Sequence, residues 1–196
     1  MTTGVKAPDF HAAVIAAAKE LQQRRNELDQ ADSALGDGDT GTMLATAAAA
    51  VISDLEDAVV HSPGQVIELT AKAVKGATGS SLGTLLAVAL RSVARSFGDA
   101  TSVTQEEVKA ALLVAAEKMK AVGGAQSGDK TIVDSVEAIA NSTLDLDAAA
   151  QKALDDFRDK PCRAGRARMY PEQSQGIDDP GMLAAKFMAR AAANIS

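Results

Sequence analysis

Three aspartates are crowded into one short polar stretch of the sequence. Asp32, Asp37 and Asp39 lie within eight residues, and the last two belong to the glycine-rich segment 36-GDGDTGT-42. Carboxylates held this close repel one another unless a cation lies between them, and their hard oxygen atoms favour Mg²⁺ or Ca²⁺. The spacing therefore predicts a divalent metal site in which all three aspartates are ligands.

The residues that follow Asp37 exclude a calcium loop of the EF-hand type. Such a loop needs an oxygen ligand at its fifth position, glycine at its sixth and glutamate at its twelfth, and this chain has Gly41, Thr42 and Ala48 there. Mg²⁺ fits better because it tolerates few carboxylates and takes its remaining ligands from water and phosphate. The alternative without a metal is that Asp37 and Asp39 form Asx-turns and cap the next helix.

Phosphate is the natural partner for such a metal, and two segments could bind it. Thr40, Gly41 and Thr42 open one predicted helix, and 76-GATGSSLG-83 opens another. Backbone N–H groups and the positive end of a helix bind anions at such positions. Neither segment matches a known phosphate loop, and each alone would also suit a helix end. Together with the aspartates they predict a nucleotide site.

Two further segments are ambiguous. The segment 123-GGAQSGDKT-131 resembles the phosphate loop G-x-x-x-x-G-K-[ST], but Asp129 intrudes before Lys130 and a helix precedes it. The basic run 163-RAGRAR-168 could contact phosphates or could equally lie in solvent at a helix end.

Helices must position these residues. Apolar residues recur at helical spacing along almost the whole chain, and no stretch shows the alternation of a strand. Start and stop signals predict eight helices, over residues 8–31, 41–57, 63–77, 80–97, 104–122, 130–142, 145–164 and 180–195. Pro161 falls late in the seventh helix and should kink or end it. The short connections favour an all-α, antiparallel up-and-down bundle or barrel, which we expect to be a single domain over residues 1–196.

The chemically rich turns should share one end of this bundle. Residues 36–42, 76–83, 123–131 and 176–181 interrupt the helical pattern with glycine and polar residues. In an up-and-down topology, the turns after the first, third, fifth and seventh helices lie at the same end. Sites assembled from loops on a rigid scaffold are where binding usually occurs. We therefore expect the nucleotide site in the loops at that end.

Composition limits the other functions. A formal charge of -6 argues against a general nucleic-acid surface, which needs clustered lysine and arginine. Cys162 is the single cysteine, so the chain cannot form an internal disulfide. No segment reaches the length of a membrane span, and the first residues lack the pattern of a signal peptide. We expect a soluble cytoplasmic protein with no nucleic-acid or membrane partner.

Four motifs carry a family resemblance: 28-LDQADSALGDGDTGT-42, 76-GATGSSLGT-84, 128-GDKTIVD-134 and 165-GRARMYPEQSQGIDDPG-181. In their order and spacing they resemble the nucleotide-binding L subunit of dihydroxyacetone kinases. The resemblance runs nearly from end to end and implies an antiparallel eight-helix barrel with nucleotide bound at one end. The segment DGDTGT is also similar to a segment in the nucleotide domain of fatty acid kinases, but residues 165–181 favour the dihydroxyacetone kinase branch.

The resemblance implies a set of site residues. Asp32, Asp37 and Asp39 would hold two Mg²⁺ ions that bridge the phosphates of ATP or ADP. The phosphates would be lined by Thr40, Gly41, Thr42, Met43, Ala77 and Thr78, and the nucleoside surrounded by Gly123, Ile132, Asp179, Pro180 and Gly181. Gln173 is assigned to the nucleotide site by its place in the last motif.

Two positions depart from the family pattern. Many relatives have histidine where this chain has Thr40, and arginine where it has Gln173 within 171-PEQSQG-176. These changes could alter how firmly the nucleotide is held, or whether the phosphate donor is free ATP or a bound ADP that a phosphocarrier protein rephosphorylates.

The resemblance implies phosphoryl transfer from nucleotide to a short-chain ketose, most simply dihydroxyacetone. In the family a histidine of a separate K subunit or domain holds the ketose, so a K-type partner is expected, and a homodimer is allowed. Four alternatives stay open: a tetrose ketose as acceptor, a fatty acid as acceptor, a nucleotide-sensing regulatory module without turnover, and a purely structural helical bundle.

Overall fold

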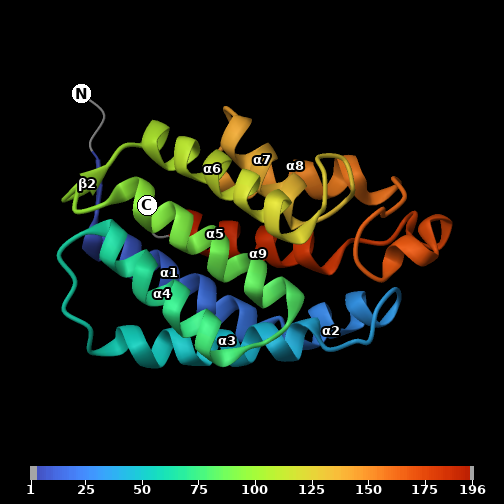
Figure 1. Ribbon diagram of the computed structural model, residues 1–196, viewed down its shortest axis with the longest axis horizontal. Helices are drawn as coiled ribbons and strands as arrows, with labels where there is room; N and C mark the ends of the chain where they lie inside the picture. Colours follow the sequence, from blue (N-terminus) through green and yellow to red (C-terminus); the bar gives the residue numbers. More distant parts are fainter. Residues whose placement is uncertain (1–3, 195–196) are drawn as a thin grey trace.

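The computed structural model describes residues 4–194, and nearly all of its regular structure is helical (Figure 1). The α-helices of these residues are α1 (Ala7–Gln23), α2 (Arg25–Ser33), α3 (Thr40–Glu56), α4 (Pro63–Ala77), α5 (Ser81–Phe97), α6 (Gln105–Gly123), α7 (Ile132–Asn141), α8 (Leu146–Arg158) and α9 (Pro180–Ala193). Two short 3₁₀-helices, η1 (Ala167–Met169) and η2 (Pro171–Ser174), lie between α8 and α9. The prediction of an all-α fold is confirmed.

The long helices close into a ring. α1 packs against α3, each helix from α3 to α8 packs against the next, and α9 returns to α1. Figure 1 shows successive helices of this ring running in alternating directions along the long axis of the molecule. α2 continues α1 and packs against the start of α3. The fold is therefore an up-and-down barrel of eight helices, with α2 as an extension of the first.

Small side chains fill much of the space between the helices. Ala47 and Ala48 on α3, Ala71 on α4, Ala150 on α8 and Ala184 on α9 are each at most 3% exposed. Alanine at a helix contact lets two helix axes approach closely, because the distance between axes depends on the side chains at the contact. This packing explains how a chain with so few aromatic residues closes its core.

Polar side chains fix where most of the helices begin. The N-cap side chains that accept a hydrogen bond from the first turn are Ser62, Ser80, Thr104, Thr131, Asp145 and Asp179, before α4 to α9 respectively. Each satisfies a backbone N–H group that has no partner within its own helix. The start signals in the sequence therefore place most helices correctly to within one or two residues.

The single helix predicted over residues 8–31 is wrong, because the structure divides it at Arg24. The backbone of Arg24 leaves the helical region, with φ −92° and ψ 9°. Its guanidinium donates to Glu20 at 2.9 Å and to Glu27 at 3.2 Å, and lies 5.1 Å from the centre of the Phe187 ring. Neither glycine nor proline marks the break, so the sequence carries no local signal for it.

The remaining differences lie at helix ends and in one small sheet. The helix predicted over residues 145–164 ends at Arg158, before Pro161, which cannot continue it. The last predicted helix reaches residue 195, which lies outside the described residues. Val5–Lys6 (β1) pairs antiparallel with Ser102–Val103 (β2). The sequence predicts no strand, because two residues in each strand are too few to show an alternating pattern.

The glycine-rich connections lie toward the same end of the barrel, on the right in Figure 1. These are the α2–α3 loop, the α4–α5 turn, the α6–α7 loop and the connection between α8 and α9. We call this last connection, residues 159–179, the arm. None of the helices in residues 4–194 is both long and apolar enough to cross a membrane.

Candidate functional site

The three aspartates predicted as metal ligands come together at this end, and we call them the aspartate triad. Asp32 is buried in the last turn of α2, Asp37 is exposed in the loop, and Asp39 is exposed directly before α3. One carboxylate oxygen from each residue lies within 4.8 Å of the other two. Three hard oxygen ligands at this separation suit one or more small divalent cations.

Asp32 organises the loop that carries the other two aspartates. Its Oδ2 accepts hydrogen bonds from the backbone N–H of Asp39 at 3.0 Å and of Thr40 at 3.1 Å. A Cβ on Gly36 would lie 2.2 Å from Oδ1 of Asp32, so only glycine allows the chain to pass there. Gly38 has φ +77°, a region that favours glycine. The glycines of 36-GDGDTGT-42 are therefore needed to fold the loop back on Asp32.

The capping alternative for Asp39 is not supported by its geometry. Asp39 occupies the N-cap position of α3, but its side chain makes no capping hydrogen bond there. The buried Asp32 binds the first N–H groups instead. The Asp39 carboxylate therefore has no capping role that would account for its place in the triad.

Asp29, which sequence analysis did not single out, ties α3 to α2. Its carboxylate accepts hydrogen bonds from the N–H and the hydroxyl group of Thr42, both at 2.8 Å. A Cβ on Gly41 would lie 2.0 Å from the carbonyl oxygen of Arg25, so glycine is required for this close approach. Burial acts to raise the pKa of Asp29, but the bonds from Thr42 and the charge of Arg25 outweigh it and lower the pKa.

The charges of the triad are unequal. Arg166, on the arm, forms an ion pair with Asp37, and this bond lowers the pKa of the Asp37 carboxyl. The negative charge of Asp37, together with partial burial and the charge of Asp32, raises the pKa of Asp39. The loop thus concentrates negative charge that one arginine balances only in part, which is the setting that a divalent cation stabilises.

The α4–α5 turn, at the same end of the barrel, leads into a second helix N-terminus, that of α5. Ala77 ends α4, and the hydroxyl oxygen of Thr78 accepts a hydrogen bond from the N–H of Ser80 at 3.1 Å. Ser80 caps α5 by accepting from the N–H of Gly83 at 2.9 Å. A Cβ on Gly83 would lie 2.2 Å from the Thr78 methyl group, so glycine lets the turn close tightly. Ala77 and Thr78 thus lie beside a helix N-terminus.

The residues predicted around the nucleoside lie in two separate places. Ile132 begins α7 and is 4% exposed, and a Cβ on Gly181 would lie 3.3 Å from the Cβ of Ile132. Gly123, at the end of α6, packs instead against the side chain of Leu85 on α5. The structure therefore brings Ile132 next to the start of α9 and places Gly123 against a different helix.

Asp179 caps α9 and carries a perturbed carboxyl group. Its side chain accepts from the N–H of Met182 at 2.9 Å, in the turn that includes Pro180. Burial raises the pKa of Asp179 to about 6, against the opposing effect of its hydrogen bonds from Met182 and Gly181. The capping hydrogen bond accounts for aspartate here without any ligand.

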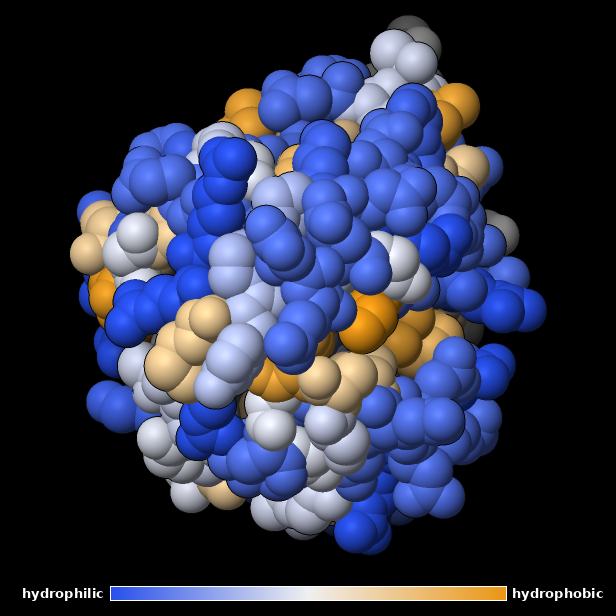
Figure 2. Space-filling model, turned by 90° about the vertical axis from the view of Figure 1, so that its right-hand side faces the viewer, coloured by the Kyte–Doolittle hydropathy of each residue, from blue (hydrophilic) through white to orange (hydrophobic). Residues whose placement is uncertain are grey.

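The two remaining predicted residues, Met43 and Gln173, lie on different elements. Met43 is half-buried and packs against the main core. Gln173 is exposed on η2 of the arm. Figure 2 views this end of the molecule directly and shows apolar residues reaching the surface near its middle, with hydrophilic residues around them.

Lys130 was set aside in the sequence as an imperfect phosphate-loop lysine, and the structure gives it another role. The side chain is 1% exposed, and its ammonium donates to the carbonyl oxygens of Arg158 at 2.7 Å, Lys160 at 2.9 Å and Ser174 at 2.7 Å. Burial lowers the pKa of Lys130. It is also the one residue other than glycine with positive φ among residues 4–194. Lys130 therefore fixes the base of the arm.

The sequence is similar to a known protein domain and to several known kinases. Residues 34–194 match the DAK2 domain. L-erythrulose 1-kinase of Mycolicibacterium smegmatis is 29% identical over 179 residues, which cover 84% of this chain and 31% of that protein. The ADP-binding subunit DhaL of the PTS-dependent dihydroxyacetone kinase of Lactococcus lactis is 24% identical over 174 residues, covering 87% of this chain and 88% of that one. The chain thus spans about a third of the erythrulose kinase and most of the DhaL subunit.

Solved structures show the same architecture. The dihydroxyacetone kinase of C. freundii in its native form superposes with a TM-score of 0.76 at 24% identity, covering 100% of this chain and 36% of that one. The same kinase in complex with AMP-PNP and Mg²⁺ gives a TM-score of 0.74 at 21% identity, covering 100% of this chain and 35% of that one. These likenesses confirm the barrel. Because the family match covers most of the sequence, this chain belongs to the DAK2 domain family.

Proposed function

We propose that this chain is the nucleotide-binding part of a dihydroxyacetone kinase, which transfers a phosphoryl group from ATP to a short-chain ketose held by a K-type subunit. The observation that carries the proposal is the aspartate triad, whose carboxylates lie within 4.8 Å of one another directly before the N-terminus of α3. Two similarities support the proposal. The chain is similar to DhaL, which is named as an ADP-binding subunit, and its four motifs resemble those of the L subunit of dihydroxyacetone kinases.

The triad fits Mg²⁺ by its chemistry. Asp32, Asp37 and Asp39 would hold two ions, as the motif resemblance implies, and the similar kinase structure was solved with AMP-PNP and Mg²⁺. Bound Mg²⁺ supplies positive charge that neutralises the phosphates during transfer. The chain itself positions the ligands: Asp32 anchors the loop through two backbone N–H groups, and the glycines allow the loop to return to it.

The hydrogen bonds of α3 refine how the phosphates would bind. The N–H groups of Thr40 and Thr42 already bind Asp32 and Asp29, so they are not free for a ligand. We therefore assign α3 an electrostatic role through its positive end. The start of α5, with Ala77 and Thr78, is the better place for direct phosphate contacts.

The nucleoside would lie between α6, α7 and α9. Ile132 offers an apolar side chain beside the turn of Asp179, Pro180 and Gly181, and Gly123, at the end of α6, packs against Leu85. The apolar surface in the middle of Figure 2 suits the face of a base. Gln173 is too exposed to hold the base, and we assign it to the rim of the site.

A four-carbon ketose is the alternative acceptor, because relatives named L-erythrulose 1-kinase and D-erythrulose kinase are 29% and 26% identical to this chain. In both cases the K-type partner would cover the aspartate end in the cytoplasm. A phosphocarrier would be needed only if ADP stays bound between turnovers. A fatty acid acceptor or a sensor without turnover remains the competing hypothesis.

Mg·ADP is expected to stabilise the protein in a melting experiment. A ligand at about 100 times its dissociation constant adds about 2.7 kcal/mol to the free energy of unfolding. For a chain of this length that corresponds to a rise of roughly 5–10 °C in Tm. EDTA should remove the gain while leaving the Tm of the ligand-free protein unchanged. No shift with saturating Mg·ADP would contradict the proposal, and binding without transfer in the presence of a K-type subunit and either ketose would favour the sensor.

A further inference from the structure

A cavity of about 320 Å³ lies between α4 and α5, the two helices joined by the α4–α5 turn. The residues that line it are Lys75, Thr78, Thr84, Ala87, Val88 and Arg91. None of these lining residues is acidic, although the whole chain carries a formal charge of -6. The cavity is therefore a place where an acidic protein gathers positive charge.

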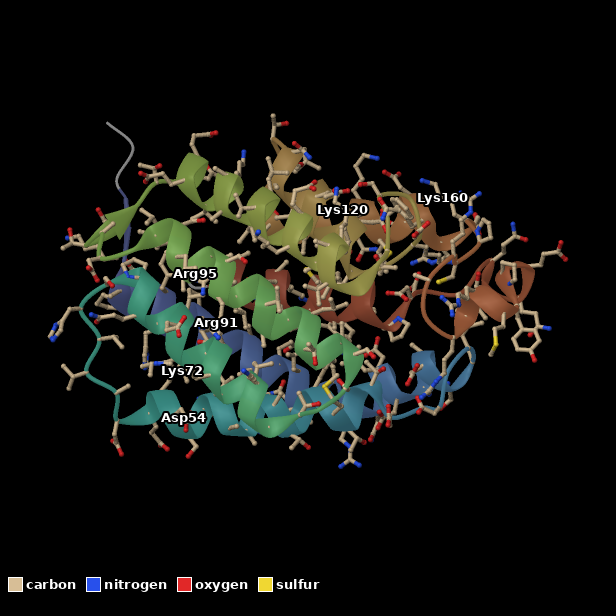
Figure 3. All side chains as sticks on the ribbon, in the orientation of Figure 1. Asp54, Lys72, Arg91, Arg95, Lys120 and Lys160 are labelled. Atoms are coloured by element: carbon tan, nitrogen blue, oxygen red, sulfur yellow. The ribbon has the colours of Figure 1, made fainter. Side chains whose placement is uncertain are left out.

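The two cations of the cavity are available to a ligand. Lys75 and Arg91 come from different helices, and within residues 4–194 no carboxylate forms an ion pair with either of them. Lys72, which does not line the cavity, is by contrast paired with Glu68 at 3.9 Å. Figure 3 shows Arg91, Arg95 and Lys72 along one face of the molecule. Two cations without acidic partners at one cavity attract an anion.

The other lining residues supply one free donor and an apolar wall. The hydroxyl oxygen of Thr78 accepts the N–H of Ser80 at 3.1 Å, which leaves the hydroxyl proton of Thr78 to donate. The hydroxyl of Thr84 already donates to the carbonyl oxygen of Ser80 at 2.9 Å, so it offers no further donor. Ala87 and Val88 add apolar surface. Such a lining suits a ligand that combines an anionic group with a short carbon chain.

We propose that this cavity binds a small phosphate monoester at a site distinct from the nucleotide site. A phosphate dianion matches the two cations in charge, and a guanidinium such as that of Arg91 binds phosphate oxygens with paired hydrogen bonds. Ligand cavities span roughly 300–1,000 Å³, so this one holds a ligand of only a few carbon atoms. Thr78 belongs to the turn that we assign to the nucleotide phosphates, whereas Lys75 and Arg91 belong to the cavity alone. The two sites can therefore be separated by substitution.

Glycerol 3-phosphate, titrated into the nucleotide-free protein at constant ionic strength and followed by NMR, tests the proposal. It should bind saturably at one site and shift the amide signals of Thr78 and Val88. Lys75→Gln and Arg91→Gln should each weaken this binding roughly tenfold, because each removes a charged hydrogen bond to phosphate. The matched control is Arg95→Gln, one helical turn along α5 from Arg91 and exposed outside the cavity. It should change the affinity by no more than about twofold.

Absence of saturable binding to the unaltered protein would overturn the proposal. An equal loss in Arg95→Gln would show that only surface charge matters, and inorganic phosphate bound as tightly as glycerol 3-phosphate would refute the ester assignment. Calorimetry with Mg·ADP separates the two sites, because Lys75→Gln and Arg91→Gln should keep the nucleotide affinity within about twofold. A matching loss of Mg·ADP binding would make the cavity part of the nucleotide site. An unaltered protein that binds glycerol 3-phosphate but no Mg·ADP would refute the proposed function alone. The Tm of each ligand-free variant confirms that it is folded.

Discussion

Asp37→Asn should leave the ligand-free protein folded and nearly as stable, yet abolish its Mg²⁺-dependent binding of nucleotide. Asparagine keeps the size and the turn-forming oxygen of the side chain. The lost ion pair with Arg166 is about half exposed, and exposed ion pairs add little stability. Removing a negative ligand from the metal site takes away charge that no turn requires. With a K-type subunit and ketose, phosphoryl transfer should fall by several orders of magnitude.

The matched control is Asp54→Asn, the same change on α3 but far from the loop end, as the label in Figure 3 shows. It should change neither the Tm nor the transfer rate. Normal transfer by Asp37→Asn would exclude Asp37 as a metal ligand and leave the Asx-turn as its role. A large loss of Tm without ligand would show instead that the loop depends on this carboxylate to fold.

Lys130→Met should be the most destabilising single change outside the apolar core. It removes the ammonium that three backbone carbonyls share, while methionine roughly keeps the length of the side chain. Leaving buried acceptors without donors costs about 1–3 kcal/mol for each group, and partial access of water to the loosened arm limits the total to roughly 3 kcal/mol. The free energy of unfolding in urea measures this loss.

Lys118→Met supplies the control, because Lys118 is exposed on α6 and because lysine and methionine have similar helix propensities. Its free energy of unfolding should stay within about 0.5 kcal/mol. Hydrogen exchange should locate the effect of Lys130→Met in the arm and the start of α7. A Lys130→Met variant as stable as the original protein would show that the arm is held by its other contacts. One of these is the hydrogen bond that the N–H of Cys162 donates to the hydroxyl of Ser174.

The fold could be predicted from the sequence because its signals are local. Helical periodicity and N-cap residues such as Ser80 and Thr104 act within one or two turns, and they placed most helix starts correctly. The break at Arg24 could not be predicted, because neither glycine nor proline marks it in the sequence. The convergence of the glycine-rich turns followed from topology alone.

The site could be predicted only in part, because only some of its signals are local in sequence. The aspartate triad stands out because its members are close in sequence and share one chemistry. Asp29 and Lys130 were missed because their partners become neighbours only through the fold: Asp29 binds Thr42 across two helices, and Lys130 binds carbonyls of residues 158–174. Asp29 and Lys130 lie within two of the four resemblance motifs, which was the signal that could have identified them.

The central claim, that the aspartate triad binds the metal ions that hold a nucleotide, is tested most directly by a crystal structure of the protein grown with Mn²⁺ and ADP. Anomalous scattering identifies manganese independently of the protein atoms. We predict two manganese peaks among the carboxylates of Asp32, Asp37 and Asp39, bridged to the phosphates of ADP. Bound ADP with no manganese at the triad, or manganese at another site, would contradict the account.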